Sequence, residues 1–341
     1  SRISGKLGPG HTMTLGLCLL LVGVLLRSFA GVVGVFLGTA LLGAGIAVGN
    51  VLVPSMVKLR FPAKVGLMTS IYTTCMAIFA GIGSGTSAPL SQEVGLGWKN
   101  TLAIWLGLTL VTLAIWLPQA GPLSRAGNQA AASLPKEKMS RSPMAWWLAL
   151  YMGSQSLLFY SMVAWMPTIL LSKGVDSDTV SLFSLLYQWV SVPSSFFMPI
   201  LAARAKDQRP LTMGMACFYF VGMAVFLVSN NPLVLGIATC INALGAGAGI
   251  SLSMCMISLR AENAGQAARL SGMVQSLGYL LAASGPFIMG AIFDLTQSWS
   301  VAISFLLIDL LVMFFAASKA GANRPLFPHL QSADSKQEPS R

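Results

Sequence analysis

Long apolar runs alternate along this chain with short segments rich in charge, glycine or proline. A hydrocarbon layer about 30 Å thick is crossed by roughly 20 apolar residues in a helix. Ten runs reach that length, and they cover residues 12–30, 32–59, 64–89, 98–117, 144–171, 179–203, 211–229, 232–259, 266–293 and 298–317. The pattern therefore predicts an all-α integral membrane protein with ten transmembrane helices.

The polar segments divide these runs into two groups. The longest polar stretch, 119–142, leaves four runs before it and six after it, and its composition is typical of a flexible linker. We therefore expect an N-terminal helical half over 1–118, a cytoplasmic linker over 119–143, a six-helix half over 144–318 and a disordered polar tail over 319–341.

The two groups carry a parallel repeat at an offset near 200 residues. LLGAGIAVGN at 41–50, followed by MVKLR at 56–60, matches ALGAGAGISL at 243–252, followed by MISLR at 256–260. Such repeats are typical of transporters built from two similar halves. Because the second copy is preceded by two spans that the first copy lacks, we expect two further helices upstream of Ser1 and a six-plus-six protein.

Charge fixes the expected orientation. The chain holds 21 Lys and Arg against 10 Asp and Glu, and the basic residues lie in short loops between apolar runs. If Ser1 is cytoplasmic, eighteen of them fall on the inner side, and only Arg27, Lys99 and Lys173 lie outside. This asymmetry predicts that both termini face the cytoplasm across the plasma (inner) membrane, and it argues against nucleic acid as a partner.

Composition excludes most catalytic chemistry. The chain is 55% hydrophobic and 9% charged, with a mean hydropathy of +0.73 and two histidines. Its five cysteines lie in apolar runs without CxxC spacing, and no HExxH, GxSxG or GxxxxGK[ST] sequence occurs. We therefore expect no enzyme, no metal and no cofactor. A secondary transporter is favoured over a channel and over a membrane-embedded enzyme.

Polar side chains inside apolar runs are candidates for a solute cavity, because such groups are costly in lipid. Tyr151 and Gln155 share a helix face four residues apart, and Gln275 and Tyr279 repeat that spacing. The full set of cavity candidates is Tyr151, Gln155, Tyr160, Trp165, Asn50, Asn242, Gln275 and Tyr279. Hydrogen bonding between helices is the alternative role for each of them.

Two charged residues are candidates for coupling or gating. Asp309 lies halfway along the last run, where a carboxyl group could carry protons. Packing is the alternative role for Asp309. Arg27 lies at the outer end of its run, where it could attract an anion or extend to the interface. The GxxxG pairs 34/38, 45/49, 81/85 and 245/249 predict close helix packing.

Four stretches carry a family likeness: GAGIAVGNVLVPSMVKLRFP at 43–62, the segment 142–174, KDQR at 206–209, and GQAARLSGMVQSLGYLLAASGP at 265–286. Through them the chain resembles the major facilitator superfamily, and within it the branch of cyanate and 2-nitroimidazole transporters. The segment 204–209 resembles the gating loop of the family, with Asp207 and Arg209 at its acidic and basic positions.

The resemblance implies a monomeric carrier in membrane lipid that moves a small organic solute or anion by alternating access. Protons are one candidate coupling ion, and the solute's own gradient is another source of energy. A fragment of such a carrier that does not transport, and a channel-like facilitator, are the alternatives.

Overall fold

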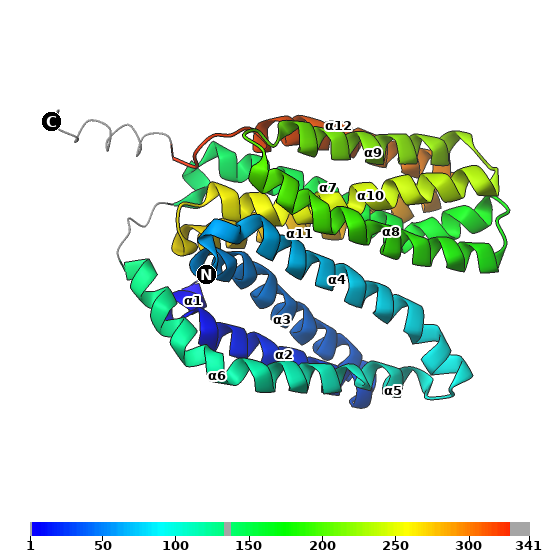
Figure 1. The fold of residues 1–341 in the computed structure, drawn as a ribbon. Helices are drawn as coiled ribbons and strands as arrows, with labels where there is room; N and C mark the ends of the chain where they lie inside the picture. Colours follow the sequence, from blue (N-terminus) through cyan, green and yellow to red (C-terminus); the bar gives the residue numbers. More distant parts are fainter. Residues whose placement is uncertain (1, 133–137, 328–341) are drawn as a thin grey trace. The chain divides into compact units, whose positions relative to one another are not determined.

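The structure, a computed structural model, describes residues 2–132 and 138–327, and within these ranges it is helical throughout (Figure 1). The α-helices are α1 (Arg2–Leu7), α2 (Pro9–Phe29), α3 (Gly31–Arg60), α4 (Val65–Ala88), α5 (Gly97–Ala103), α6 (Trp105–Ala132), α7 (Pro143–Ser172), α8 (Ser177–Arg204), α9 (Arg209–Val228), α10 (Pro232–Arg260), α11 (Ala264–Thr296) and α12 (Trp299–Ala320). Short 3-10 helices cover Pro62–Lys64 and Met139–Arg141, and a π-helix covers Pro89–Glu93.

Ten of the described helical segments are long and apolar enough to cross a membrane. They coincide with the ten runs predicted from sequence, with ends that differ by a few residues in most cases. The prediction of ten spans is therefore confirmed at the level of length and composition.

Two of the polar segments differ from expectation. Helix α6 continues to Ala132, so the first part of the segment expected to be a flexible linker is helical. The start of the tail also packs, since Leu326 and Phe327 are buried and the Ser142 hydroxyl donates to the Leu326 carbonyl at 2.7 Å. Residues 133–137 and 328–341 lie outside the described part of the chain.

The chain forms two compact units. Unit 1 comprises residues 1–62, 79–136 and 263–272, and unit 2 comprises residues 63–78, 137–262 and 273–341. Each unit thus contains one short segment from the opposite half of the sequence. Unit 1 takes in the start of α11, and unit 2 takes in the first half of α4. The boundary between the sequence halves predicted at 119–143 stays a prediction.

Unit 1 is built on α2, with α3 and α6 packed against it. Glycine permits the close approach of α2 and α3, because a Cβ at Gly45 would lie 2.7 Å from the Gly16 carbonyl and one at Gly38 would lie 2.6 Å from the Gly23 carbonyl. The packing role predicted for these two glycines is confirmed. A Cβ at Gly49 would meet nothing within 4 Å, so Gly49 does not serve this contact.

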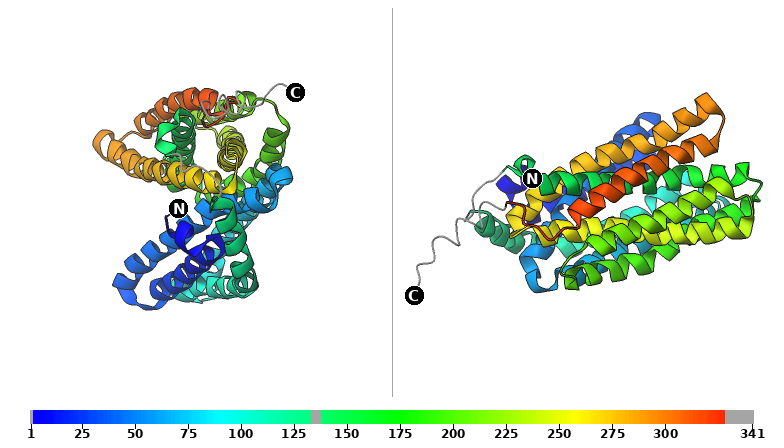
Figure 2. Two further views of the ribbon diagram at one scale, coloured as in Figure 1. Left: turned by 90° about the vertical axis from the view of Figure 1, so that its left-hand side faces the viewer. Right: turned by 90° about the horizontal axis from the view of Figure 1, so that it is seen from above.

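Unit 2 is a bundle of α7 to α12, seen from one end in the left view of Figure 2. Its two central helices are α7 and α10, of which 56% and 61% of the apolar stretch is buried, against 39% or less in every other span. Most polar side chains on α7 and α10 are therefore buried inside the protein, which makes unit 2 the part of the molecule in which to look for a site.

Hydrogen bonds join each exchanged segment to its unit. The exchanged segments are the start of α11, in unit 1, and the first half of α4, in unit 2. In unit 1, the Ser55 hydroxyl donates to the Ala264 carbonyl at 2.8 Å. In unit 2, the Thr73 hydroxyl donates to the Ser195 carbonyl of α8 at 3.2 Å. A Cβ at Gly66 would lie 2.5 Å from the Ala203 Cβ, so only glycine lets α4 approach α8 this closely.

Candidate solute-binding site

Buried polar side chains without a hydrogen-bond partner gather in unit 2. Within the described residues, the side-chain atoms of this kind in the unit include the hydroxyls of Thr69, Tyr72, Thr74, Tyr151, Ser154, Ser161, Tyr187 and Tyr219, Oε1 of Gln155, both amide atoms of Asn242, Nε of Arg260, and Oδ2 of Asp309. Each such group costs about 1–3 kcal/mol when it is buried without a partner. So many in one bundle indicate a place where water or a solute supplies the missing hydrogen bonds.

Helix α7 contributes the centre of this set. Tyr151 and Gln155 are fully buried on one face, as their spacing predicted. The Gln155 amide nitrogen donates to the Ser156 hydroxyl at 2.9 Å, while its Oε1 remains without a partner in the described chain. A Cβ at Gly249 of α10 would lie 2.7 Å from this oxygen, so glycine leaves the space that Gln155 occupies.

Helices α8 and α9 add two tyrosines that the sequence analysis missed. Tyr187 and Tyr219 are buried at 1% and 0% exposure, and the Tyr219 hydroxyl lies within electrostatic reach of the hydroxyls of Tyr187 and Tyr151. Neither Tyr187 nor Tyr219 makes a hydrogen bond of normal geometry within the described chain. The signal that would have found them is the one used for Tyr151: a hydroxyl in the middle of an apolar span.

The remaining members come from α10, α11 and α4. Asn242 is fully buried and has no hydrogen-bond partner for its amide among the described residues; a Cβ at Gly222 of α9 would lie 2.5 Å from its Nδ2. Gln275 is 2% exposed, and Tyr279 is half-buried and interacts electrostatically with Tyr72 of the exchanged α4 segment. The predicted pairs on α7 and α11 thus lie in the same unit as the tyrosines that were missed.

Two further residues predicted for the cavity make ring contacts with other helices, and their predicted role in solute binding stays a prediction. Trp165 donates its indole N–H to the Pro286 carbonyl at 2.8 Å and packs on Trp299 at a ring distance of 5.3 Å, so it joins α7 to α11 and α12 near the C-terminal end of α7. Tyr160 is 40% exposed. Its ring contacts Phe159 and Tyr279 at 5.2 and 6.5 Å, respectively.

Asn50 and Arg27 belong to unit 1. Asn50 is half-buried on α3, and its carbonyl accepts a long hydrogen bond of 3.5 Å from Ser271 in the exchanged start of α11. Arg27 is half-buried in the last turn of α2. Their predicted roles in solute binding stay predictions.

Asp309 is half-buried on α12 and faces α7. Its carboxylate lies beside the fully buried Ser154 hydroxyl, one turn from Tyr151. The carboxyl group is thus directed into the bundle, next to the polar set.

The predicted gating loop forms a different contact from the one expected. Asp207 and Arg209 approach to 3.9 Å, but both are about half exposed, and exposed ion pairs of this kind contribute little. The stronger interaction comes from Arg260, which donates to Gln208 Oε1 at 2.6 Å and to the Gly321 carbonyl at 3.1 Å. Arg260 is only 7% exposed, and it joins α10, the α8–α9 loop and the end of α12.

The polar set is uncharged apart from Asp309 and Arg260, and Arg260 is the last residue of α10. Within unit 2, Lys and Arg occur in the spans only at or near helix ends, at Lys64, Arg204, Arg209, Arg260 and Lys319. Hydroxyl and amide groups can both donate and accept hydrogen bonds, so the site is suited to a neutral molecule with polar edges.

Ten candidate membrane spans in the described part of the chain, together with buried uncharged hydrogen-bonding groups inside unit 2, are the features of a polytopic membrane carrier. The family model "Major Facilitator Superfamily" matches residues 1–286, and the chain belongs to that family. It is a multi-span transporter and not an enzyme, and its bacterial relatives imply an inner-membrane location.

The relatives confirm the branch that the sequence resembles, which includes proteins named for 2-nitroimidazole and cyanate transport. The "Uncharacterized transporter YycB" of Bacillus subtilis (strain 168) is 45% identical, with 96% of this chain and 81% of that protein covered. The "2-nitroimidazole transporter" of Escherichia coli (strain K12) is 35% identical, with 95% and 82% covered. The solved proton:xylose symporter XylE shares the fold with a TM-score of 0.68, 14% identity, and 97% and 84% coverage.

Proposed function

We propose that this protein is a secondary active transporter that moves a small, uncharged, hydrogen-bonding organic solute across the membrane by alternating access. The observation that carries this proposal is the set of buried, unpartnered hydroxyl and amide groups of Tyr151, Gln155, Tyr187, Tyr219 and Asn242 in unit 2. A solute that satisfied them would recover several hydrogen bonds at once.

The preference for a neutral solute follows from electrostatics. An anion taken into a membrane interior needs a cation or several donors fixed around it, because desolvating a charge is expensive. In unit 2 the basic residues of the spans lie at or near the helix ends, and the one acid in the middle of a span, Asp309, would repel an anion. A planar, neutral compound of the 2-nitroimidazole class therefore fits this set better than cyanate does.

Asp309 is the candidate for proton coupling. Asp309 is beside Ser154, which lies one turn from Tyr151 on α7, so the charge of Asp309 can act on the proposed site. A carboxyl group placed there can bind a proton in one conformation and release it in another, which is the requirement for a proton-coupled carrier.

The proposed topology places both termini of this chain in the cytoplasm. The three basic residues Arg27, Lys99 and Lys173 then lie on the outer face, and the rest lie on the inner face or at its border. We further propose that the protein works as a monomer.

The experiment that tests this function is uptake and efflux of labelled 2-nitroimidazole and labelled cyanate by cells expressing the protein, with and without a protonophore. We expect a saturable, protonophore-sensitive change for the nitroimidazole and none for cyanate. Equal transport of cyanate would contradict the assignment of a neutral solute. No change for either compound, with the protein shown to be in the membrane, would reject this solute class.

Countertransport distinguishes the proposed carrier from the two alternatives. Unlabelled solute on the far side accelerates the flux of labelled solute through a carrier. Its binding speeds the return of the binding site to the side that holds the label. It does not accelerate flux through a channel. A chain that does not transport would show neither saturable flux nor countertransport, whereas its binding of solute could still be measured.

A further inference from the structure

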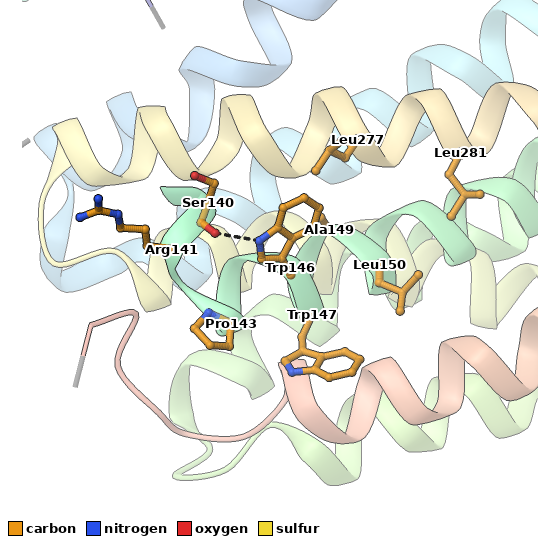
Figure 3. Close-up of a pocket in the computed structure, with 9 residues that line it drawn as sticks. All are labelled: Ser140, Arg141, Pro143, Trp146, Trp147, Ala149, Leu150, Leu277 and Leu281. Atoms are coloured by element: carbon orange, nitrogen blue, oxygen red, sulfur yellow. Dashed lines mark hydrogen bonds between the residues drawn. The ribbon is translucent and has the colours of Figure 1, made fainter. Parts of the chain in front are cut away.

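A cavity of about 530 Å³ lies apart from the polar set, at the basic end of unit 2. It is lined by Ser140, Arg141, Pro143, Trp146, Trp147, Ala149, Leu150, Leu277 and Leu281, which come from the start of α7 and from α11 (Figure 3). The walls are apolar, and the polar groups lie together at one end. None of the residues proposed for solute binding contributes to it.

The mouth of the cavity carries a positive charge. Arg141 is exposed and precedes the first turn of α7, and in Figure 3 it lies at the opposite end of the cavity from Leu281. The N-terminus of α7 adds a partial positive charge next to this arginine. Such a mouth favours a phosphate group over a neutral or cationic one.

Aromatic side chains frame the same end. Trp146 is 49% exposed and is held by a hydrogen bond of 2.9 Å from its indole N–H to the Ser140 carbonyl. Trp147 packs edge-on against Phe315 of α12 at 5.4 Å, and the Lys319 ammonium lies over that Phe315 ring at 5.5 Å. Tryptophan and basic side chains gather in this way at the level of lipid headgroups.

A second cavity provides a contrast. It measures about 350 Å³ between α9 and α12, and its lining of Ala216, Cys217, Phe220, Val221, Leu310, Leu311 and Phe314 contains no charged residue. Lipid chains can fill such a groove without selection by headgroup. The cavity at α7 and α11 differs because an apolar groove and a cationic mouth are joined end to end.

We propose that the groove between α7 and α11 is a binding site for an anionic phospholipid of the membrane. One acyl chain lies along Ala149, Leu150, Leu277 and Leu281, and the phosphate lies at Arg141. We assign a lipid because the groove is lined by helices that are long and apolar enough to span a membrane, and because Arg141 at its mouth matches an anionic headgroup in charge. This site is independent of the solute site, and its occupancy is measured without transport.

The test uses the purified protein in nanodiscs of phosphatidylethanolamine and phosphatidylglycerol, the latter carrying a photoactivatable group at the end of one acyl chain. After illumination we expect labelled peptides to contain residues 146–150 or 277–281. Labelling spread evenly over all lipid-facing helices would overturn the proposal.

Charge and shape are tested by two matched pairs of variants. Native mass spectrometry should show that Arg141→Glu lowers retention of phosphatidylglycerol at least about fivefold, as expected for one basic group near a headgroup. Arg204→Glu, with the same charge change at another basic helix end, should leave retention unchanged. Equal losses in the two variants, or equal retention of phosphatidylethanolamine and phosphatidylglycerol, would contradict a selective site.

The second pair fills the groove. Leu277→Trp should abolish photolabelling of 146–150, because the larger ring occupies the place of the acyl chain. Leu280→Trp, on the same helix at a side chain that is 74% exposed, should leave that labelling intact. Labelling that persists in Leu277→Trp would show that the chain does not lie in this groove. Size-exclusion profiles identify any variant that fails to fold.

Discussion

Two tyrosines of α7 show how much the environment of a single residue decides its role. Tyr151 is fully buried with no hydrogen-bond partner for its hydroxyl among the described residues, whereas Tyr160, nine residues later, is 40% exposed. Both were expected in the cavity from sequence, because each interrupts an apolar run. Only Tyr151 has a hydroxyl whose missing partner a solute could replace.

This difference predicts unequal effects of removing one oxygen atom. Tyr151→Phe should raise the KM for transport about threefold to tenfold, since one hydrogen bond to the solute is lost. Tyr160→Phe should stay within about twofold of the wild type. Initial uptake rates at equal amounts of protein in the membrane measure both. Equal effects of the two changes would place the solute away from Tyr151.

Asp309 gives a second prediction at this scale. If it carries the coupled proton, Asp309→Asn should abolish accumulation against a gradient while leaving exchange of solute across the membrane intact, because exchange needs no net proton movement. Ser154→Ala should weaken coupling without abolishing it, since it removes only the neighbour of the carboxylate. Protonophore-sensitive accumulation that survives in Asp309→Asn would assign this residue to packing.

At the scale of single helices, the start of α8 is fixed by a side chain. Asp176 accepts a hydrogen bond from the Thr179 backbone N–H at 2.9 Å, and this bond holds the pKa of the Asp176 carboxyl below its ordinary value. A lowered native pKa means that the cap stabilises the folded state above the unfolded pKa of about 3.9 and that this stabilisation is lost as pH falls through the native pKa.

The cap therefore predicts a pH-dependent effect of substitution. Asp176→Ala should lower Tm at pH 7, and the difference from wild type should shrink toward zero as pH falls below about 4. Asp176→Asn supplies the comparison, because its amide oxygen caps the helix at every pH. Thermal unfolding of the purified protein at several pH values measures this. A Tm difference for Asp176→Ala that stays constant down to pH 3 would exclude the carboxylate as its source.

The existence of the helices could be read from the sequence, but their terminal contacts could not. Apolar runs of sufficient length fixed all ten spans, because lipid leaves the backbone few alternatives to helix. The continuation of α6 to Ala132 was missed because the composition of 119–142 is typical of a flexible linker, and the helix accommodates both Pro118 and Pro122. Tyr187 and Tyr219 carry the same local signal as Tyr151, a hydroxyl inside an apolar span, but the sequence has no signal for the proximity of their hydroxyls across helices.

At the scale of the whole molecule, the sequence halves do not coincide with the compact units. The first half of α4 belongs to unit 2 and the start of α11 to unit 1, and small residues make both exchanges possible. The repeat predicted two similar halves. It contained no signal for this exchange, because the contacts join residues more than 100 positions apart, such as Thr73 and Ser195.

The exchange makes Gly66 a sensitive position. Gly66→Leu should force α4 away from α8, because even a Cβ would lie 2.5 Å from that of Ala203. We expect a large loss of transport, of about tenfold or more, with the protein still present in the membrane. Gly214→Leu is the control, since a Cβ at Gly214 meets nothing within 4 Å. Normal transport by Gly66→Leu would show that the carrier does not need this contact.

The exchanged segments also have a consequence for how the protein is made. Spans enter the membrane in order as the chain is synthesised and then associate. The Ser55 hydroxyl of unit 1 has its partner at Ala264, 209 residues later. The contacts of unit 1 can therefore be completed only after α11 has been synthesised. A ribosome that stalls after α10 would leave this bundle unfinished in the bilayer, which makes the last two helices the step at which membrane quality control can distinguish finished copies from abandoned ones.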